Sequence, residues 1–102
     1  MNLERLALPA LMAQWARAVD RLERAVDTNP SDHLEDLAVR HEIARRIRVR
    51  PVTAETREML AELDGIYREA TVECVGCVAG EHDAAAQGWT AAREWYLWRR
   101  PR

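Results

Sequence analysis

Two cysteines and a histidine have the spacing of metal ligands. Cys74 and Cys77 form a C-x-x-C pair, and His82 follows five residues later. Thiolates three residues apart on a helix can share a zinc ion, and a histidine just past the helix end can add a third bond. A histidine of the second predicted helix or an acidic neighbour would complete the site, the acidic candidates being Glu73, Glu81 and Asp83. Structural zinc sites usually have two ligand pairs, whereas this sequence offers one pair and a single histidine. A zinc site is therefore an alternative rather than the favoured interpretation.

The same cysteine pair permits a redox and a purely structural interpretation. Thioredoxin-like chemistry needs an exposed thiol at the start of a helix within an α/β fold. Cys74 and Cys77 instead lie late in a predicted helix, on its apolar stripe. We therefore favour small buried hydrophobic residues over a metal or redox role.

A second, incomplete metal-binding motif lies around His41. His41 and Glu42 begin an H-E-x-x-H motif, but Arg45 replaces the second histidine. We expect His41 to be a core histidine with a hydrogen-bond partner such as Tyr67. The sequence offers no paired E-x-x-H ligands, catalytic triad or glycine-rich phosphate loop, so it gives no support for an enzyme.

The C-terminal residues interleave tryptophan and arginine. Protein interfaces use this combination for anchoring, and proteins that bind single-stranded nucleic acids use it for stacking. We expect Trp89 and Tyr96 to be core residues. The pairs Trp89–Arg93 and Trp95–Arg99 have the i, i+4 spacing that lets a guanidinium lie over an indole. The predicted interface residues here are Trp95, Trp98 and Arg99.

Positive charge is concentrated in the middle of the chain. Residues 40–57 carry six arginines against two glutamates, although the net charge of the whole chain is −2. Nucleic-acid binding is therefore an alternative function, and it would weaken steeply with added salt. The overall acidic balance favours it less than protein binding. Its candidate residues are Arg45, Arg46, Arg48 and Arg50.

Apolar residues recur at helical spacing along nearly the whole chain. Pro9, Asn29 or Ser31, and Thr53 are start signals, whereas Gly80 and Pro101 suit helix ends. The pattern predicts an all-α fold, an antiparallel bundle of three to four helices. The predicted helices are about 9–27, 31–49, 53–79 and 82–99.

The second predicted helix carries more apolar surface than one partner helix can cover. Val39, Ile43 and Ile47 lie almost opposite the stripe that starts at Leu34. This second stripe needs a cover from the N-terminal lead-in, from the fourth helix or from another chain. We expect it to bind protein together with the Trp95 and Trp98 surface. The predicted function is that of a small non-enzymatic regulatory, inhibitory or assembly protein, acting on another protein or as a homodimer.

Length and composition set the remaining limits. The 102 residues allow one domain with its own core. The chain lacks the roughly 18 consecutive apolar residues of a membrane span and a signal-peptide pattern, so we expect a cytoplasmic protein without a membrane partner. All fifteen basic residues are arginine, which is typical of a GC-rich bacterial or phage genome. No cofactor other than the zinc alternative is expected.

Overall fold

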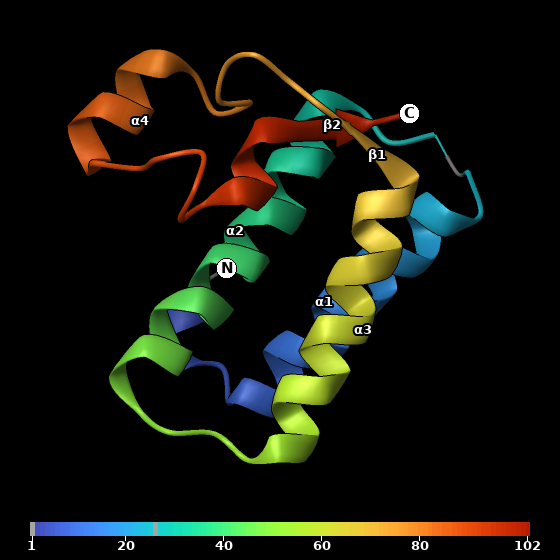
Figure 1. Ribbon diagram of the computed structural model, residues 1–102. Helices are drawn as coiled ribbons and strands as arrows, with labels where there is room; N and C mark the ends of the chain where they lie inside the picture. The colour runs from blue at the N-terminus through green and yellow to red at the C-terminus, as the bar shows by residue number, and fades with distance from the viewer. Residues whose placement is uncertain (1, 26) are drawn as a thin grey trace.

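Three long helices form most of the fold, and α1 (Leu8–Glu23) packs against both α2 (Pro30–Val49) and α3 (Ala54–Ala70) (Figure 1). The computed structural model describes residues 2–25 and 27–102. The predicted all-α helical bundle is confirmed. The shorter elements are the 3₁₀ helices η1 (Leu3–Arg5) and η2 (Trp95–Trp98), the helix α4 (Glu81–Gln87), and the strands β1 (Thr71–Glu73) and β2 (Arg99–Pro101).

Local capping sets the helix starts. Asn29 Oδ1 accepts a hydrogen bond from the backbone N–H of Asp32 at 2.8 Å, and Thr53 Oγ1 accepts one from Thr56 at 3.1 Å. These contacts satisfy backbone donors that a first helical turn leaves free. At its other end α1 stops at Glu23 rather than at the predicted Asp27, because Ala25 adopts a left-handed conformation with φ of 56°.

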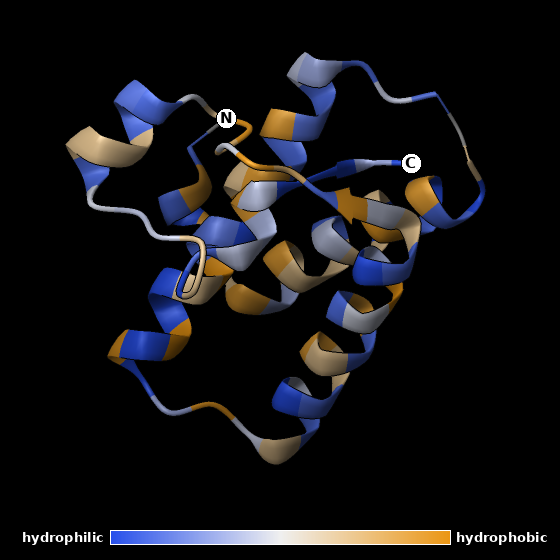
Figure 2. Cartoon of the chain, turned by 45° about the horizontal axis from the view of Figure 1, so that its top comes forward, coloured by the Kyte–Doolittle hydropathy of each residue, from blue (hydrophilic) through white to orange (hydrophobic). Residues whose placement is uncertain are grey.

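The core lies between the long helices and extends to the C-terminal residues. Each long helix carries hydrophobic and hydrophilic residues, as amphipathic packing requires (Figure 2). Trp15, Tyr67 and Tyr96 are almost completely buried, and Ile43 is fully buried. Residues from both ends of the chain therefore share one core.

The prediction that Val39 and Ile43 bind another protein is wrong, because both are buried within this chain. Ile47 is partly buried against the same core. Both η1 and η2 lie against α2, so the lead-in and the C-terminal segment cover its second stripe. These three residues consequently do not form an open docking face.

The third helix ends earlier than the apolar spacing predicts. It stops at Ala70 rather than near residue 79, and Thr71–Glu73 pair antiparallel with Arg99–Pro101. Thr71 and Val72 are β-branched residues, which favour strands over helices. The prediction missed this pairing because its two strands have only three residues each and lie far apart in the sequence.

The ladder tolerates Pro101 because of its register. Hydrogen bonds run from Arg102 N to Ala70 O and from Cys74 N to Trp98 O. Thr71 and Pro101 lie opposite each other between these bonded positions. Alternate residues of an antiparallel ladder point their backbone groups away from the partner strand. Pro101 therefore needs no N–H toward β1.

The predicted fourth helix is also shorter than expected. α4 ends at Gln87 because Gly88 adopts a left-handed conformation with φ of 71°. Beyond it, the Glu94 carboxylate accepts a hydrogen bond from Thr90 N at 2.9 Å, and residues 95–98 form η2. The prediction of a single helix over 82–99 is therefore wrong. No helix within residues 2–25 and 27–102 is long and apolar enough to cross a membrane.

Replacing either of two glycines with alanine should change the stability of the protein, in opposite directions. Gly65 lies inside α3 with open space where a Cβ would be, so Gly65→Ala should stabilise the protein by about 0.5–1 kcal/mol. Gly88 has a positive φ, so Gly88→Ala should destabilise it by about 1–2 kcal/mol. Thermal and urea unfolding of both variants checks this prediction. Equal effects would contradict the assigned backbone conformations.

Candidate protein-docking site

Three of the predicted interface residues meet at one hollow on the surface. This hollow has a volume of about 340 Å³ and lies where the end of α3, β1 and η2 come together. We call it the tryptophan hollow. It is lined by Arg68, Glu73, Cys74, Val75, Ala91, Trp95, Trp98 and Arg99.

Trp95 forms the aromatic wall of the tryptophan hollow. The guanidinium of exposed Arg68 lies 3.9 Å from the centre of its ring, and that of buried Arg40 lies 5.9 Å away. The ring also packs against Tyr67 and Tyr96, with centroid distances of 5.9 and 5.7 Å. Trp95 is therefore held between the core and the hollow rather than presented freely.

The two predicted i, i+4 cation–π pairs are replaced by other contacts. Arg93 Nε donates to Glu94 at 2.7 Å, and its Nη2 donates to Gly88 O at 2.8 Å. Arg99 Nε donates to Thr71 Oγ1 at 2.8 Å. Because residues 88–99 are not one helix, residues four apart no longer lie one turn above each other.

Arg99 joins strands rather than facing a partner. Besides its bond to Thr71 Oγ1, its Nη2 lies 3.1 Å from the backbone oxygens of Arg68 and Thr71. Its Nη1 lies 3.6 Å from the Glu73 carboxylate. The guanidinium thus fixes β2 to the end of α3 and contributes the wall of the hollow.

A buried ion pair lies on the core side of the aromatic residues of the tryptophan hollow. Arg40 on α2 donates from Nε and Nη2 to the two carboxylate oxygens of Asp64 on α3, at 2.9 and 2.8 Å. Trp15 on α1 donates from Nε1 to the same carboxylate at 3.2 Å. The Arg40 guanidinium also lies 4.7 Å from the centre of the Tyr96 ring. One carboxylate therefore connects all three long helices and positions the cation under the aromatic residues.

Tyr96, rather than Tyr67, is the hydrogen-bond partner of His41. His41 Nδ1 lies 2.9 Å from the Tyr96 hydroxyl. Burial raises the pKa of Tyr96 to about 12. Burial also lowers the pKa of His41, and it is the largest of the causes that act on this histidine. The phenol and the imidazole are therefore both neutral near pH 7, and they share one hydrogen bond. Tyr67 donates instead to the backbone oxygen of Tyr96 at 3.0 Å, and burial raises its pKa.

Val75 stands at the rim of the tryptophan hollow and is fully exposed. On either side of it, Cys74 N donates to Trp98 O and Val78 N donates to Leu97 O, each at 2.8 Å. These bonds fix both ends of a short loop on the backbone of η2. The loop therefore presents an apolar side chain beside the aromatic wall.

Arg68 and Glu73 give the tryptophan hollow groups of opposite charge. Within the described ranges, the Arg68 side chain has a contact with the Trp95 ring but no hydrogen-bond acceptor. The Glu73 side chain is 86% exposed. The hollow therefore combines the Arg68 cation, an exposed carboxylate that lies 3.6 Å from Arg99 Nη1, and apolar surface, which together suit protein binding.

No family model, curated protein or solved structure matches the chain.

The predicted zinc ligands do not converge. Cys77 is buried and Cys74 half-buried, and both lie in the segment after β1 rather than on a helix. His82 is exposed in the first turn of α4. In the part of the chain that the structure describes, no three histidine, cysteine or acidic side chains are placed to hold a metal ion together.

Most of the predicted nucleic-acid residues are engaged within the protein. Arg45 and Arg46 donate to Glu42, with distances of 2.7 to 2.9 Å, and Arg46 also donates to Leu3 O. Arg48 donates to Glu94 at 2.9 Å. Their positive charges are thus partly balanced, because Arg45 and Arg46 share one carboxylate and Arg48 shares Glu94 with Arg93. Arg50 is exposed at the end of α2.

Glu42 should make the protein sensitive to acid. Hydrogen bonds from Arg45 and then from Arg46 lower the pKa of this carboxyl from 4.5 to about 2, against the opposing effect of burial. A carboxyl with a lowered native pKa stabilises the folded state above its ordinary pKa and loses this effect as pH falls. We expect the free energy of unfolding to decrease between about pH 5 and pH 2.

Urea unfolding across this pH range checks the prediction. Glu42→Gln should lower the free energy of unfolding at pH 7 by on the order of 2 kcal/mol and flatten its decrease toward pH 2. Glu62→Gln, at an exposed position on α3, is the matched control and should leave the decrease unchanged. An unchanged acid response in Glu42→Gln would contradict the assigned role of this carboxylate.

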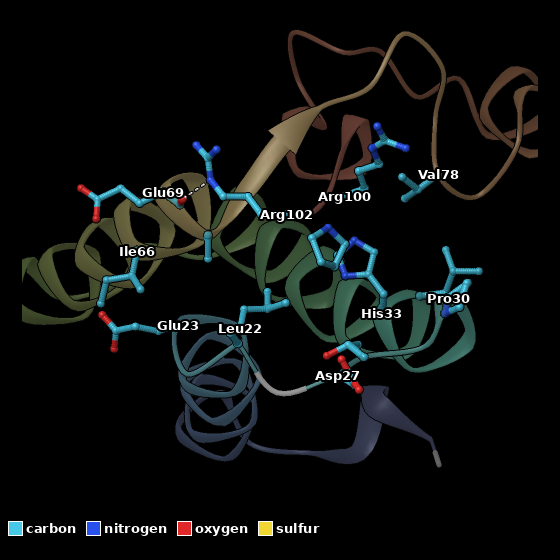
Figure 3. A pocket seen from close by; sticks show the side chains of 15 residues that line it. Leu22, Glu23, Asp27, Pro30, His33, Ile66, Glu69, Val78, Arg100 and Arg102 are labelled. Carbon is cyan, nitrogen blue, oxygen red and sulfur yellow. Dashed lines mark hydrogen bonds between the residues drawn. The ribbon is translucent and has the colours of Figure 1, made fainter.

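A second, larger cavity opens between the ends of α1 and α3, the start of α2 and the C-terminal strand (Figure 3). Its volume is about 800 Å³, and both charge signs occur among its lining residues, which include Glu23, Asp27, Arg100 and Arg102. His33 also lines it. His33 Nε2 lies 3.2 Å from the backbone oxygen of Arg99. A carbonyl oxygen can only accept, so His33 Nε2 donates. The other ring nitrogen of His33, Nδ1, is buried and has no hydrogen-bond partner among the described residues. Sequence reasoning did not identify this cavity.

Proposed function

We propose that this protein is a small non-enzymatic protein-interaction protein that docks through the tryptophan hollow, and that the docked partner is a second copy of the same chain. The observation that carries the proposal is the meeting of Trp95, Trp98 and Arg68 at one hollow with Val75 exposed on its rim. Aromatic and arginine side chains are the usual anchors of protein interfaces. A regulatory, inhibitory or assembly role would follow from this docking.

The charges of the hollow favour a second copy over an unrelated partner. Arg68 and Glu73 line the same hollow. In a two-fold symmetric dimer the same surface of both chains meets, so a contact between two different residues occurs twice. Arg68 of each copy would pair with Glu73 of the other, and both Val75 side chains would be removed from water. A partner surface of one charge sign would place a like charge opposite either Arg68 or Glu73.

Sedimentation equilibrium over a range of protein concentrations tests the proposal. The mass should rise toward twice the 11.7 kDa of one chain. Val75→Asp should hold the mass near one chain, because it places a charge in the apolar contact. Val49→Asp is the matched control: Val49 is also exposed but lies outside the hollow, so this variant should still dimerise. A wild-type protein that remains monomeric at every concentration would overturn the proposal.

A further inference from the structure

The loop that carries Val75 is flanked by the two cysteines of the chain. Cys74 precedes and Cys77 follows the loop tip, and the backbone N–H groups of Cys74 and Val78 donate to Trp98 O and Leu97 O. Four residues of extended chain would span roughly 13 Å, whereas the two acceptors belong to neighbouring residues whose Cα atoms are about 3.8 Å apart. The chain therefore cannot be fully extended between Cys74 and Val78, and it bends at Val75 and Gly76, between the two cysteines.

We infer that Cys74 and Cys77 are a modification site, which forms a reversible intramolecular disulfide by exchange with a low-molecular-weight disulfide. Both cysteines are free thiols in this structure. A disulfide needs Cα atoms about 4.4–6.8 Å apart, a separation that residues three apart reach only where the chain bends between them, as it does at Val75 and Gly76. The disulfide itself does not need the proposed dimer, because both cysteines lie in one chain, but docking of a second copy over the tryptophan hollow would cover Cys74, so the exchange takes place on the monomer.

The different exposure of the two thiols sets the order of the reaction. Cys74 is half-buried and lines the tryptophan hollow, whereas Cys77 is only 8% exposed and belongs to the core. A small disulfide therefore reaches Cys74 first. Exchange proceeds by attack of a thiolate on a disulfide sulfur, so access and deprotonation govern its rate.

The exchange takes two steps. The Cys74 thiolate attacks one sulfur of the small disulfide, whose S–S bond breaks, and one small thiolate leaves with the bonding electrons. The Cys77 thiolate then attacks the Cys74 sulfur of the mixed disulfide and displaces the second small thiolate. The protons lost by the two cysteines are taken up by the two released thiolates. Two protein thiols are thus oxidised while one small disulfide is reduced to two thiols.

Intact-mass measurement after exchange with glutathione disulfide tests this inference. The reduced full-length protein is incubated with mixtures of reduced and oxidised glutathione, and remaining thiols are alkylated with a maleimide. The expected product has lost two hydrogens and carries neither maleimide nor glutathione. Two maleimide labels at every glutathione ratio, or a persistent glutathione adduct on the wild type, would overturn the inference.

Single variants separate the two cysteines. Cys77→Ala should accumulate one glutathione on Cys74, because no second thiol is present to displace it. Cys74→Ala should form at least about tenfold less adduct, since Cys77 is buried. Circular dichroism identifies any variant that fails to fold, and Cys77→Ser then replaces Cys77→Ala. Equal adduct formation by both variants would contradict the proposed order. One zinc ion per chain, lost when either cysteine is replaced, would overturn the disulfide assignment.

Discussion

Asp64→Ala should destabilise the protein by about 3–5 kcal/mol, the largest single effect that we expect. The substitution leaves the Arg40 guanidinium buried without its carboxylate and removes the acceptor of Trp15 Nε1. A buried charge without a partner keeps its desolvation cost but loses the compensating attraction. Because a domain of this size has only about 5–15 kcal/mol of stability, the variant should be close to unfolding.

Urea unfolding measures this loss against two further variants. Asp20→Ala removes an exposed ion pair with Arg24 and should cost no more than about 1 kcal/mol. The double variant Arg40→Met with Asp64→Leu removes both charges and should recover most of the stability, although Trp15 still lacks an acceptor. If Asp64→Ala cost no more than Asp20→Ala, the carboxylate would not be connecting the three helices as we describe.

Arg68→Glu should weaken dimerisation by roughly 30- to 100-fold, which corresponds to about 2–3 kcal/mol. In a two-fold dimer the substitution acts twice, since each new glutamate faces Glu73 of the other copy. It also removes the contact of Arg68 with the Trp95 ring, which should cost about 0.5–1 kcal/mol of folding stability. The dissociation constant from sedimentation measures the first effect, and thermal unfolding measures the second.

Arg57→Glu is the matched control for this charge reversal. Arg57 is exposed on α3, like Arg68, but does not line the tryptophan hollow. The control changes the net charge by the same amount and should change the dissociation constant less than about threefold, because only screened long-range charge effects remain. Equal weakening by both variants would indicate a general charge effect rather than docking at the hollow.

The helices were predictable because their signals are local. Apolar residues at helical spacing, Asn29, Thr53 and the prolines determine α1, α2 and the start of α3 within a few residues. The end of α3 was not predictable in this way. The apolar residues of 70–78 fit helical spacing, but long-range pairing between β1 and β2 decides their conformation.

The candidate site was predictable only where the residue type alone marks it. Trp95 and Trp98 stand out by residue type, and both line the hollow. Val39 and Ile43 were assigned to a docking surface because sequence spacing does not show that the chain ends return to cover α2. The sequence does not mark Arg68, Glu73 and Val75 as docking residues, since only the early end of α3 brings them beside η2.

The direct test of docking through the tryptophan hollow uses Arg68→Glu and Glu73→Arg, each alone and mixed in equal amounts. Each variant alone places like charges opposite one another in a two-fold dimer, whereas the mixed pair restores an opposite-charge contact at both positions. Sedimentation equilibrium should therefore give a mass near one 11.7 kDa chain for each variant alone and near two chains for the mixture. A mixture that stays monomeric at concentrations where the wild type dimerises would contradict this account.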